Sequence, residues 1–179
     1  LENKMKIGMT YNLKSDWQIT DGDMVDGNAE FDKLETIDDL ARIFESFGHK
    51  VTKIGNVQQL LAQIDDLDVD IVFNIHEGIG DRNRESQIPI ILDLHNIPFT
   101  GSDALTLGIT LDKMVSKKCF IADGVPTPRY FVAHNSKNLE KLNTIGFPLI
   151  VKTMWEGTSK GLSEKSRVED FAGLKRQVE

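Results

Sequence analysis

The sequence has little cysteine and no long apolar run, and both absences exclude classes of protein. The single cysteine, Cys119, cannot form an internal disulfide, so we expect a reducing compartment. No apolar run reaches the roughly 20 residues that span a bilayer, and the first residues lack the apolar segment of a secretory signal. We therefore expect a cytoplasmic protein with no membrane partner.

An excess of basic residues is also missing. The formal net charge is −7 at pH 7, whereas a nucleic-acid-binding surface needs excess Lys and Arg to displace counterions. We therefore expect no nucleic acid partner. A small molecule that carries phosphate needs only a local positive site, so such a ligand stays allowed.

Several catalytic and nucleotide-binding motifs are absent. The chain contains no GxGxxG after its first strand, no GxxxxGK[ST], no GxSxG and no Cys/His cluster at zinc-ligand spacing. These absences exclude a dinucleotide fingerprint, a P-loop, a nucleophile elbow and a zinc centre. A bound nucleotide would need another architecture.

Strand and helix patterns alternate over the first hundred residues. Strands are expected at 5–11, 50–55, 69–78 and 97–101. Helices are expected from Glu35 to Gly48, at 57–65 and at 86–96. This order predicts a parallel α/β domain whose ligands gather at the carboxyl ends of the strands, where His76 and Glu77 would lie.

The second part of the chain has a different pattern. We expect, in order, a helix over 111–124, a strand from about Arg129, a helix over 136–146, a strand over 147–153, its hairpin partner over 161–168, and a helix to the terminus. Two or three strands in about 70 residues would leave an open sheet edge, so we expect this unit to be incomplete.

The segment "KTMWEGTSKG", residues 152–161, has the composition of a phosphate-binding loop. Lys152 ends an apolar strand, and glycines and hydroxyls follow that can offer N–H and O–H donors to phosphate oxygens. The alternative is a mobile hairpin turn. Taken singly, a helical lysine such as Lys113 is ordinarily solvated, and a lone His76 is ordinarily structural. The segment "GDRNRESQ" at 80–87 is by default a solvent-exposed loop with mutual ion pairs, but its position after a buried strand favours a binding role about equally.

The order of these motifs resembles the D-alanine–D-alanine ligases of the ATP-grasp superfamily. The matching elements are His76, Gln87, "NIPFTGS" at 96–102, Asp112–Lys113, "GVPTP" at 124–128, Val151–Lys152 and the loop from Glu156 to Gly161. The resemblance implies a parallel, Rossmann-like (pre-ATP-grasp) α/β substrate domain, residues 1–103. It is followed by the first, incomplete part of an ATP-grasp nucleotide-binding domain, residues 104–179.

The resemblance also implies roles for individual residues. Lys113 and Lys152 correspond to the two lysines that contact the phosphates of ATP. The loop with Glu156, Gly157, Ser159 and Gly161 corresponds to the flap over the triphosphate. Thr158 and His76 correspond to residues beside the first amino-acid substrate, and Glu30 is taken as the substrate-facing acid.

In such ligases ATP phosphorylates a carboxylate, and an amine attacks the resulting acylphosphate. The implied reaction joins two D-alanines, or a similar amino acid pair, for peptidoglycan precursors, with ATP and Mg²⁺ and in a homodimer. The family's adenine-binding hinge, catalytic arginine and magnesium ligands lie well beyond the flap. We therefore expect the metal ligands beyond Glu179, and we expect this chain to be part of a longer ligase and inactive by itself.

The chain departs from the family pattern on the substrate side. Glu77 replaces the glycine after the histidine, "GDRNRES" replaces the "GEDG" run, and the N-terminal GGxSxE signature is absent. Two alternatives stay open: an ATP-grasp ligase for a different amino acid or peptide, and a non-catalytic α/β binding module.

Overall fold

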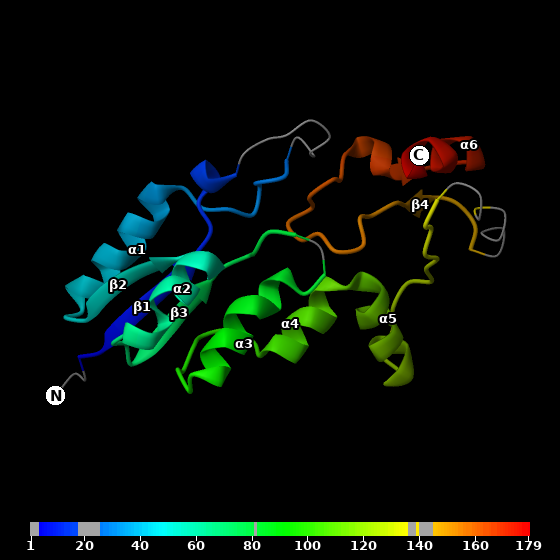
Figure 1. Cartoon of the computed structure of the whole chain (residues 1–179). Coiled ribbons are helices and arrows are strands. Elements are labelled where there is room, and N and C mark those ends of the chain that lie inside the picture. The colour runs from blue at the N-terminus through cyan, green and yellow to red at the C-terminus, as the bar shows by residue number, and fades with distance from the viewer. Residues whose placement is uncertain (1–3, 18–25, 81, 136–138, 140–144) are drawn as a thin grey trace. The chain divides into compact units, whose positions relative to one another are not determined.

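The computed structural model describes residues 4–17, 26–80, 82–135, 139 and 145–179 (Figure 1). The chain forms two compact units, Leu1–Leu111 and Asp112–Glu179. The sequence-based division after residue 103 assigns the intervening helix, Ala104–Leu111, to the second part. That division stays a proposal about the domain organisation.

The first unit is a parallel sheet with helices on both faces, as the alternating pattern predicts. Its three strands, in the spatial order β2-β1-β3, are β1 (Lys6–Tyr11), β2 (Lys50–Gly55) and β3 (Ile71–Ile75). Its α-helices are α1 (Leu34–Ser46), α2 (Val57–Gln63), α3 (Gln87–Leu94) and α4 (Ala104–Leu111). Short 3-10 helices cover Lys14–Asp16, Ile64–Asp66 and Arg84–Ser86.

Each face of the sheet has its own hydrophobic core. Met9 and Tyr11 of β1 pack with Ile37 and Ala41 of α1. On the other face, residues of β2 and β3 pack against α2 and α3, the buried members being Ile54, Leu60, Ile64, Val72, Ile88 and Leu92. Figure 1 shows α1 on one side of the strands and α2 and α3 on the other. The strand ends are therefore held firmly between two layers.

The expected strand at 97–101 is reduced to a single bridge between Val72 and Phe99. Val72 N donates to Pro98 O at 2.8 Å, and Thr100 N donates to Val72 O at 2.9 Å. Pro98 has no N–H, so it cannot donate to a longer ladder. The prediction of a fourth strand is therefore wrong for the described residues. Helix α4, which directly follows this segment, was not expected from the sequence.

The second unit contains α5 (Lys113–Ala122), β4 (Leu149–Ile150), β5 (Arg167–Val168), α6 (Phe171–Val178) and a 3-10 helix at Glu164–Ser166. Strands β4 and β5 pair antiparallel, which confirms the expected hairpin, although each strand has only two residues. Leu139, Val168 and Leu174 form its buried core.

The strand expected from about Arg129 is absent from the described residues, so that prediction is wrong. Pro126 and Pro128 remove two backbone donors just before it, and Arg129 Nη2 instead donates to Ile145 O at 3.1 Å. The helix expected over 136–146 falls almost entirely outside the described residues. Among the helices that are described, none combines the length and the apolar character needed to cross a bilayer.

Candidate functional site

A polar cluster lies at the carboxyl ends of β1 and β3 in the first unit. Asn12 follows β1, and its Oδ1 accepts hydrogen bonds from Glu77 N (3.1 Å) and Gly78 N (2.8 Å), which follow β3. Gly78 has a φ of +80°, and a Cβ there would lie 2.6 Å from the backbone oxygen of Arg84. The two strand ends and the segment before α3 are therefore in close contact, at the edge where parallel sheets bind ligands.

A buried salt bridge supports this cluster. Arg84 Nη2 lies 3.1 Å from Glu30 Oε2, and the two side chains are only 2% and 1% exposed. The default expectation of a solvent-exposed loop at 80–87 is therefore wrong for Arg84. Local sequence patterns do not predict this pair, because Glu30 lies in a loop 54 residues before Arg84. The structure brings Glu30 to the same region as Glu77, whose ionisation it influences.

His76 is buried in the same region, with 4% of its surface exposed. Neither ring nitrogen has a hydrogen-bond partner among the described residues. Burial lowers the pKa of His76 to about 4, because the imidazolium form loses hydration. The side chain is therefore neutral at pH 7, and its ring can donate or accept a hydrogen bond.

Glu77 carries a half-buried carboxylate. Burial raises its pKa to about 7, and the negative charges of Glu85 and Glu30 add to the effect, while Arg84 opposes it. Within the described ranges, its carboxylate makes no hydrogen bond and no salt bridge. Glu77 is the acid at which the chain departs from the ligase pattern.

In the second unit, residues at the start of α5 form hydrogen bonds to the glycine loop, residues 152–161. Asp112 caps α5 through Oδ1, which accepts from Met114 N and Val115 N at 3.0 Å each, while its Oδ2 accepts from Trp155 Nε1 at 3.1 Å. Lys113 N donates to Met154 O at 3.2 Å, and Lys113 Nζ donates to the backbone oxygen of Glu156. The structure thus brings together Lys113 and the glycine loop, both of which the resemblance assigns to ATP.

The loop itself is closed by an internal ion pair. Lys160 Nζ lies 2.7 Å from Glu156 Oε2, and Lys160 is only 7% exposed. Thr158 and Ser159 are exposed and have left-handed backbones, with φ of +45° and +59°. Gly157 O accepts from Lys160 N at 2.8 Å, and Gly161 has a φ of +72°. The sequence does not predict this role for Lys160, because i, i+4 spacing predicts contact only on a helix and this segment is a loop.

Lys152, by contrast, is exposed, and no described residue forms a salt bridge with it. Of the predicted residues, Lys113, Glu156 and the glycines are close together in the second unit. His76 and Glu30 belong to the first unit. No group of three or more His, Cys, Asp and Glu side chains that could hold a metal ion occurs in the described parts of the chain.

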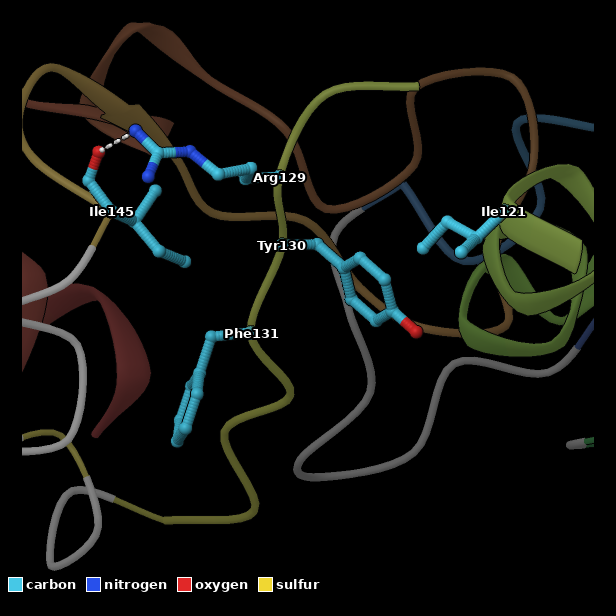
Figure 2. A pocket seen from close by; sticks show the side chains of 5 residues that line it. All are labelled: Ile121, Arg129, Tyr130, Phe131 and Ile145. Atoms are coloured by element: carbon cyan, nitrogen blue, oxygen red, sulfur yellow. Dashed lines mark hydrogen bonds between the residues drawn. The ribbon is translucent and has the colours of Figure 1, made fainter. Parts of the chain in front are cut away.

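A separate apolar pocket of about 320 Å³ also lies in the second unit (Figure 2). It is lined by Ile121, Arg129, Tyr130, Phe131 and Ile145. The guanidinium of Arg129 reaches the backbone oxygen of Ile145, and the ammonium of Lys117 lies 5.4 Å from the centre of the Tyr130 ring. No predicted site residue lines this pocket.

Comparisons with known sequences find ligases among the relatives, although no family model matches the chain. The chain is 34% identical over 125 residues to the D-alanine–D-alanine ligase of Pseudomonas putida and 31% identical over 124 residues to that of Gloeobacter violaceus. These matches cover 69% and 66% of the chain but 39% and 40% of the ligases. It is also 37% identical over 92 residues, 51% of the chain and 27% of the relative, to the uncharacterized protein y4sG of Sinorhizobium fredii. The chain thus spans about two fifths of the length of the curated ligases it matches.

Solved structures show the same fold. The crystal structure of a D-alanine–D-alanine ligase from Bacillus anthracis matches 86% of this chain and 47% of its own, with a TM-score of 0.61 and 21% identity. The structure of the ligase from that organism complexed with ATP matches 99% of this chain and 52% of its own, with a TM-score of 0.61 and 22% identity. The expected architecture is therefore confirmed. The chain is a homologue of the D-alanine–D-alanine ligases and has the fold of about half of such an enzyme.

Proposed function

We propose that this chain supplies the first substrate site and the phosphate-binding residues of an ATP-dependent carboxylate–amine ligase. The ligase joins two D-alanines, or a similar amino acid pair, through an acylphosphate. The names of the curated relatives and the ATP complex of a structural neighbour support this function. Because the chain spans about two fifths of those relatives, we propose the activity for a protein in which this chain is joined to the rest of a ligase, and no activity for the chain alone.

The observation that carries the proposal is the contact between Lys113 and the glycine loop. Lys113 lies at the N-terminus of α5, where the helix dipole favours an anion, and its ammonium group donates to the backbone of Glu156. Phosphate oxygens of ATP would take over this hydrogen bond. Lys152 adds a second positive charge, and Gly157, Ser159 and Gly161 belong to the loop whose backbone would surround the phosphates.

ATP supplies the phosphoryl group that turns a carboxylate into an acyl donor. The lysines neutralise the charge on the phosphates and orient them toward the carboxylate. The resemblance implies that the magnesium ligands belong to another part of the ligase, and no group of three or more metal-ligating side chains occurs among the described residues.

His76, Glu30 and Thr158 are the proposed substrate-side residues. The neutral ring of His76 lies in the buried cluster and can hydrogen bond to a substrate without adding charge. Glu30 belongs to the same buried cluster, where its carboxylate forms a salt bridge with Arg84. Thr158, exposed on the glycine loop, offers a hydroxyl. Peptidoglycan precursor synthesis in the cytoplasm by a homodimer is the setting that the resemblance implies.

A second candidate is a ligase of this type that acts on a different amino acid. Glu77 and Arg84 favour it, since both are charged side chains inside the cluster that meets the first substrate. Phosphate release that depends on an amino acid other than D-alanine would distinguish this candidate.

Titration calorimetry with ATP, on a protein in which this chain is joined to the rest of the ligase, tests the phosphate site. Lys113→Ala and Lys152→Ala should each weaken ATP binding by roughly tenfold or more, because each removes a charge-assisted contact. Lys118→Ala, at an exposed position on the same helix, is the matched control and should change little. Unchanged affinity in both test variants would refute the site. In a protein that includes the rest of the ligase, the absence of magnesium-dependent phosphate release with any amino acid would refute the activity and favour a binding module.

A further inference from the structure

The acid that the resemblance assigns to the substrate is already engaged inside the protein. Glu30 Oε2 is bound by Arg84 Nη2 at 3.1 Å, and the Glu30 side chain is 1% exposed. Breaking a buried pair to release one partner leaves the other charge uncompensated, which costs several kcal/mol, about 3–5 in measured cases. A substrate group would have to compete with this pair for Glu30.

The carboxylate of Glu77, unlike that of Glu30, has no salt-bridge partner among the described residues. It is half-buried, and no described residue forms a hydrogen bond with it. Three other acids act on the Glu77 carboxylate, and Arg84 opposes them; the acids are Glu30, Asp32 and Glu85. Burial disfavours the ionised form of Glu77 and raises its pKa to about 7, and the negative charges of these neighbouring acids add to the effect. A bound cation would remove that cost.

Two buried polar side chains nearby give a second, independent indication of a ligand. Asn12 is 1% exposed, and although its Oδ1 accepts from the backbone of Glu77 and Gly78, its Nδ2 has no partner among the described residues. Both ring nitrogens of His76 also have no hydrogen-bond partner among the described residues. Buried polar atoms without partners cost about 1–3 kcal/mol each, and they are rare unless a ligand or water completes them.

We propose that Glu77, rather than Glu30, is the carboxylate that receives a primary ammonium group of the substrate, with Asn12 and His76 as its polar neighbours. This proposal deepens the proposed function, on whose first substrate site it rests, and it makes Glu77 a specificity-determining residue. Arg84 is then a positioning residue that keeps Glu30 occupied. The ammonium group comes either from the α-carbon of an amino acid or from the end of a side chain.

The test uses the ¹⁵N-labelled 179-residue chain and NMR spectroscopy. The reporters are the backbone amides of Glu77 and Gly78 and the side-chain amide of Asn12, which touch one another. The probes are D-alanine, which has only an α-ammonium group, Nα-acetyl-D-lysine, which has only a side-chain ammonium group, and D-lactate, which has neither. At least one ammonium probe should shift the reporters, and D-lactate should not. The probe that acts identifies the source of the ammonium group.

Glu77→Gln should weaken binding of that probe by about tenfold or more, as expected for loss of a charged hydrogen bond. Glu45→Gln, which makes the same charge change at an exposed position of α1, should leave the affinity unchanged. In the wild-type chain, a saturating probe should lower the pKa of Glu77, a measurement that does not depend on the variant folding. Equal binding by Glu77→Gln, an unchanged pKa of Glu77, or no reporter shift with either ammonium probe would overturn the proposal.

These outcomes are distinct from a failure of the proposed function. If the lysine variants bind ATP normally while the ammonium probes behave as expected, the phosphate site is wrong and Glu77 is right. If ATP binding depends on the lysines but Glu77→Gln binds D-alanine as the wild type does, the assignment of Glu77 alone is wrong.

Discussion

Arg84 and Glu30, which are 54 residues apart in the sequence, form a salt bridge that is almost completely shielded from water. Losing one partner would leave an unpaired buried charge, so we expect Arg84→Met to lower the free energy of unfolding by about 3–5 kcal/mol. The double variant Arg84→Met/Glu30→Leu should recover most of that loss, because it removes both charges. Urea denaturation followed by circular dichroism measures the cycle.

Arg42→Met is the matched control for this cycle. Arg42 pairs with Asp39 on the surface of α1, where both side chains are largely exposed. Surface pairs contribute about 0–1 kcal/mol, so this variant should change stability little. Equal losses in Arg84→Met and Arg42→Met would contradict a special role for the buried pair.

The neighbours His76 and Glu77 should give opposite dependences of stability on pH. Glu77, with a pKa raised from 4.5 to about 7, keeps its proton in the folded state while the unfolded state releases it, so stability falls as the pH rises through this window. His76, with a pKa lowered from 6.5 to about 4, stays neutral when folded while the unfolded state takes up a proton, so stability falls as the pH decreases. Between pH 4.5 and 6.5 the two effects oppose each other.

Single variants should separate the two effects. From pH 6.5 to 4.5, Glu77→Gln should lose stability relative to the wild type and His76→Gln should gain it, each by on the order of 1–2 kcal/mol. Urea denaturation at several pH values in this range provides the measurement. Parallel pH profiles for the two variants would show that these groups do not titrate as their burial implies.

Gly78 should tolerate no side chain. Gly78→Ala combines a left-handed backbone, φ +80°, with a Cβ only 2.6 Å from Arg84 O. The left-handed conformation alone costs about 1–2 kcal/mol, and the clash adds to it. Gly101→Ala is the control, since Gly101 also has a positive φ, +99°, but nothing lies within 4 Å of the added Cβ. Thermal unfolding should place Gly78→Ala clearly below the control; similar melting temperatures would exclude the close contact.

Asp112 should anchor the glycine loop through Trp155. Asp112→Asn keeps an oxygen that can cap α5, but it replaces the acceptor of Trp155 Nε1 with an amide donor. Asp112→Ala removes both interactions and should cost about 1 kcal/mol more, the usual value of an N-cap. In a Trp17→Phe background, both variants should change the emission of Trp155. An unchanged emission spectrum would contradict the contact.

The sequence predicts the periodic elements of the first unit well because their patterns are local. The apolar face of α1 and the apolar run of β3 depend on residues a few positions apart, and both elements are confirmed. The strands expected at 97–101 and from Arg129 have suitable residues, but a strand also needs a partner with free donors. Pro98 lies within the first segment, and Pro126 and Pro128 lie just before the second, and each removes a backbone donor that a longer ladder would need.

In the candidate site, too, the features that depend on local pattern are predicted and those that depend on distant residues are not. The pattern predicts the position of His76 after a buried strand. The contact between Lys113 and the backbone of Glu156 does not follow from local pattern, and only the resemblance assigns both residues to the same ligand. The partner of Arg84 was not readable, because a salt bridge between distant loops leaves no periodic trace. The role of Asn12 is not predicted either, because the backbone amides that its side chain binds lie 65 and 66 residues away.

Strand β1 is the first strand in the sequence and the central one in the sheet, and this has a consequence for folding during synthesis. Lys6 pairs with Lys50, and Tyr11 pairs with Ile75, so β1 cannot complete either pairing until the later strands exist. Ribosomes add about 5–20 residues per second, so β1 waits roughly 3–13 s for β3. During that interval the edge of β1 that pairs with β3 stays open, so the strand that positions Asn12 is exposed to mispairing on the ribosome.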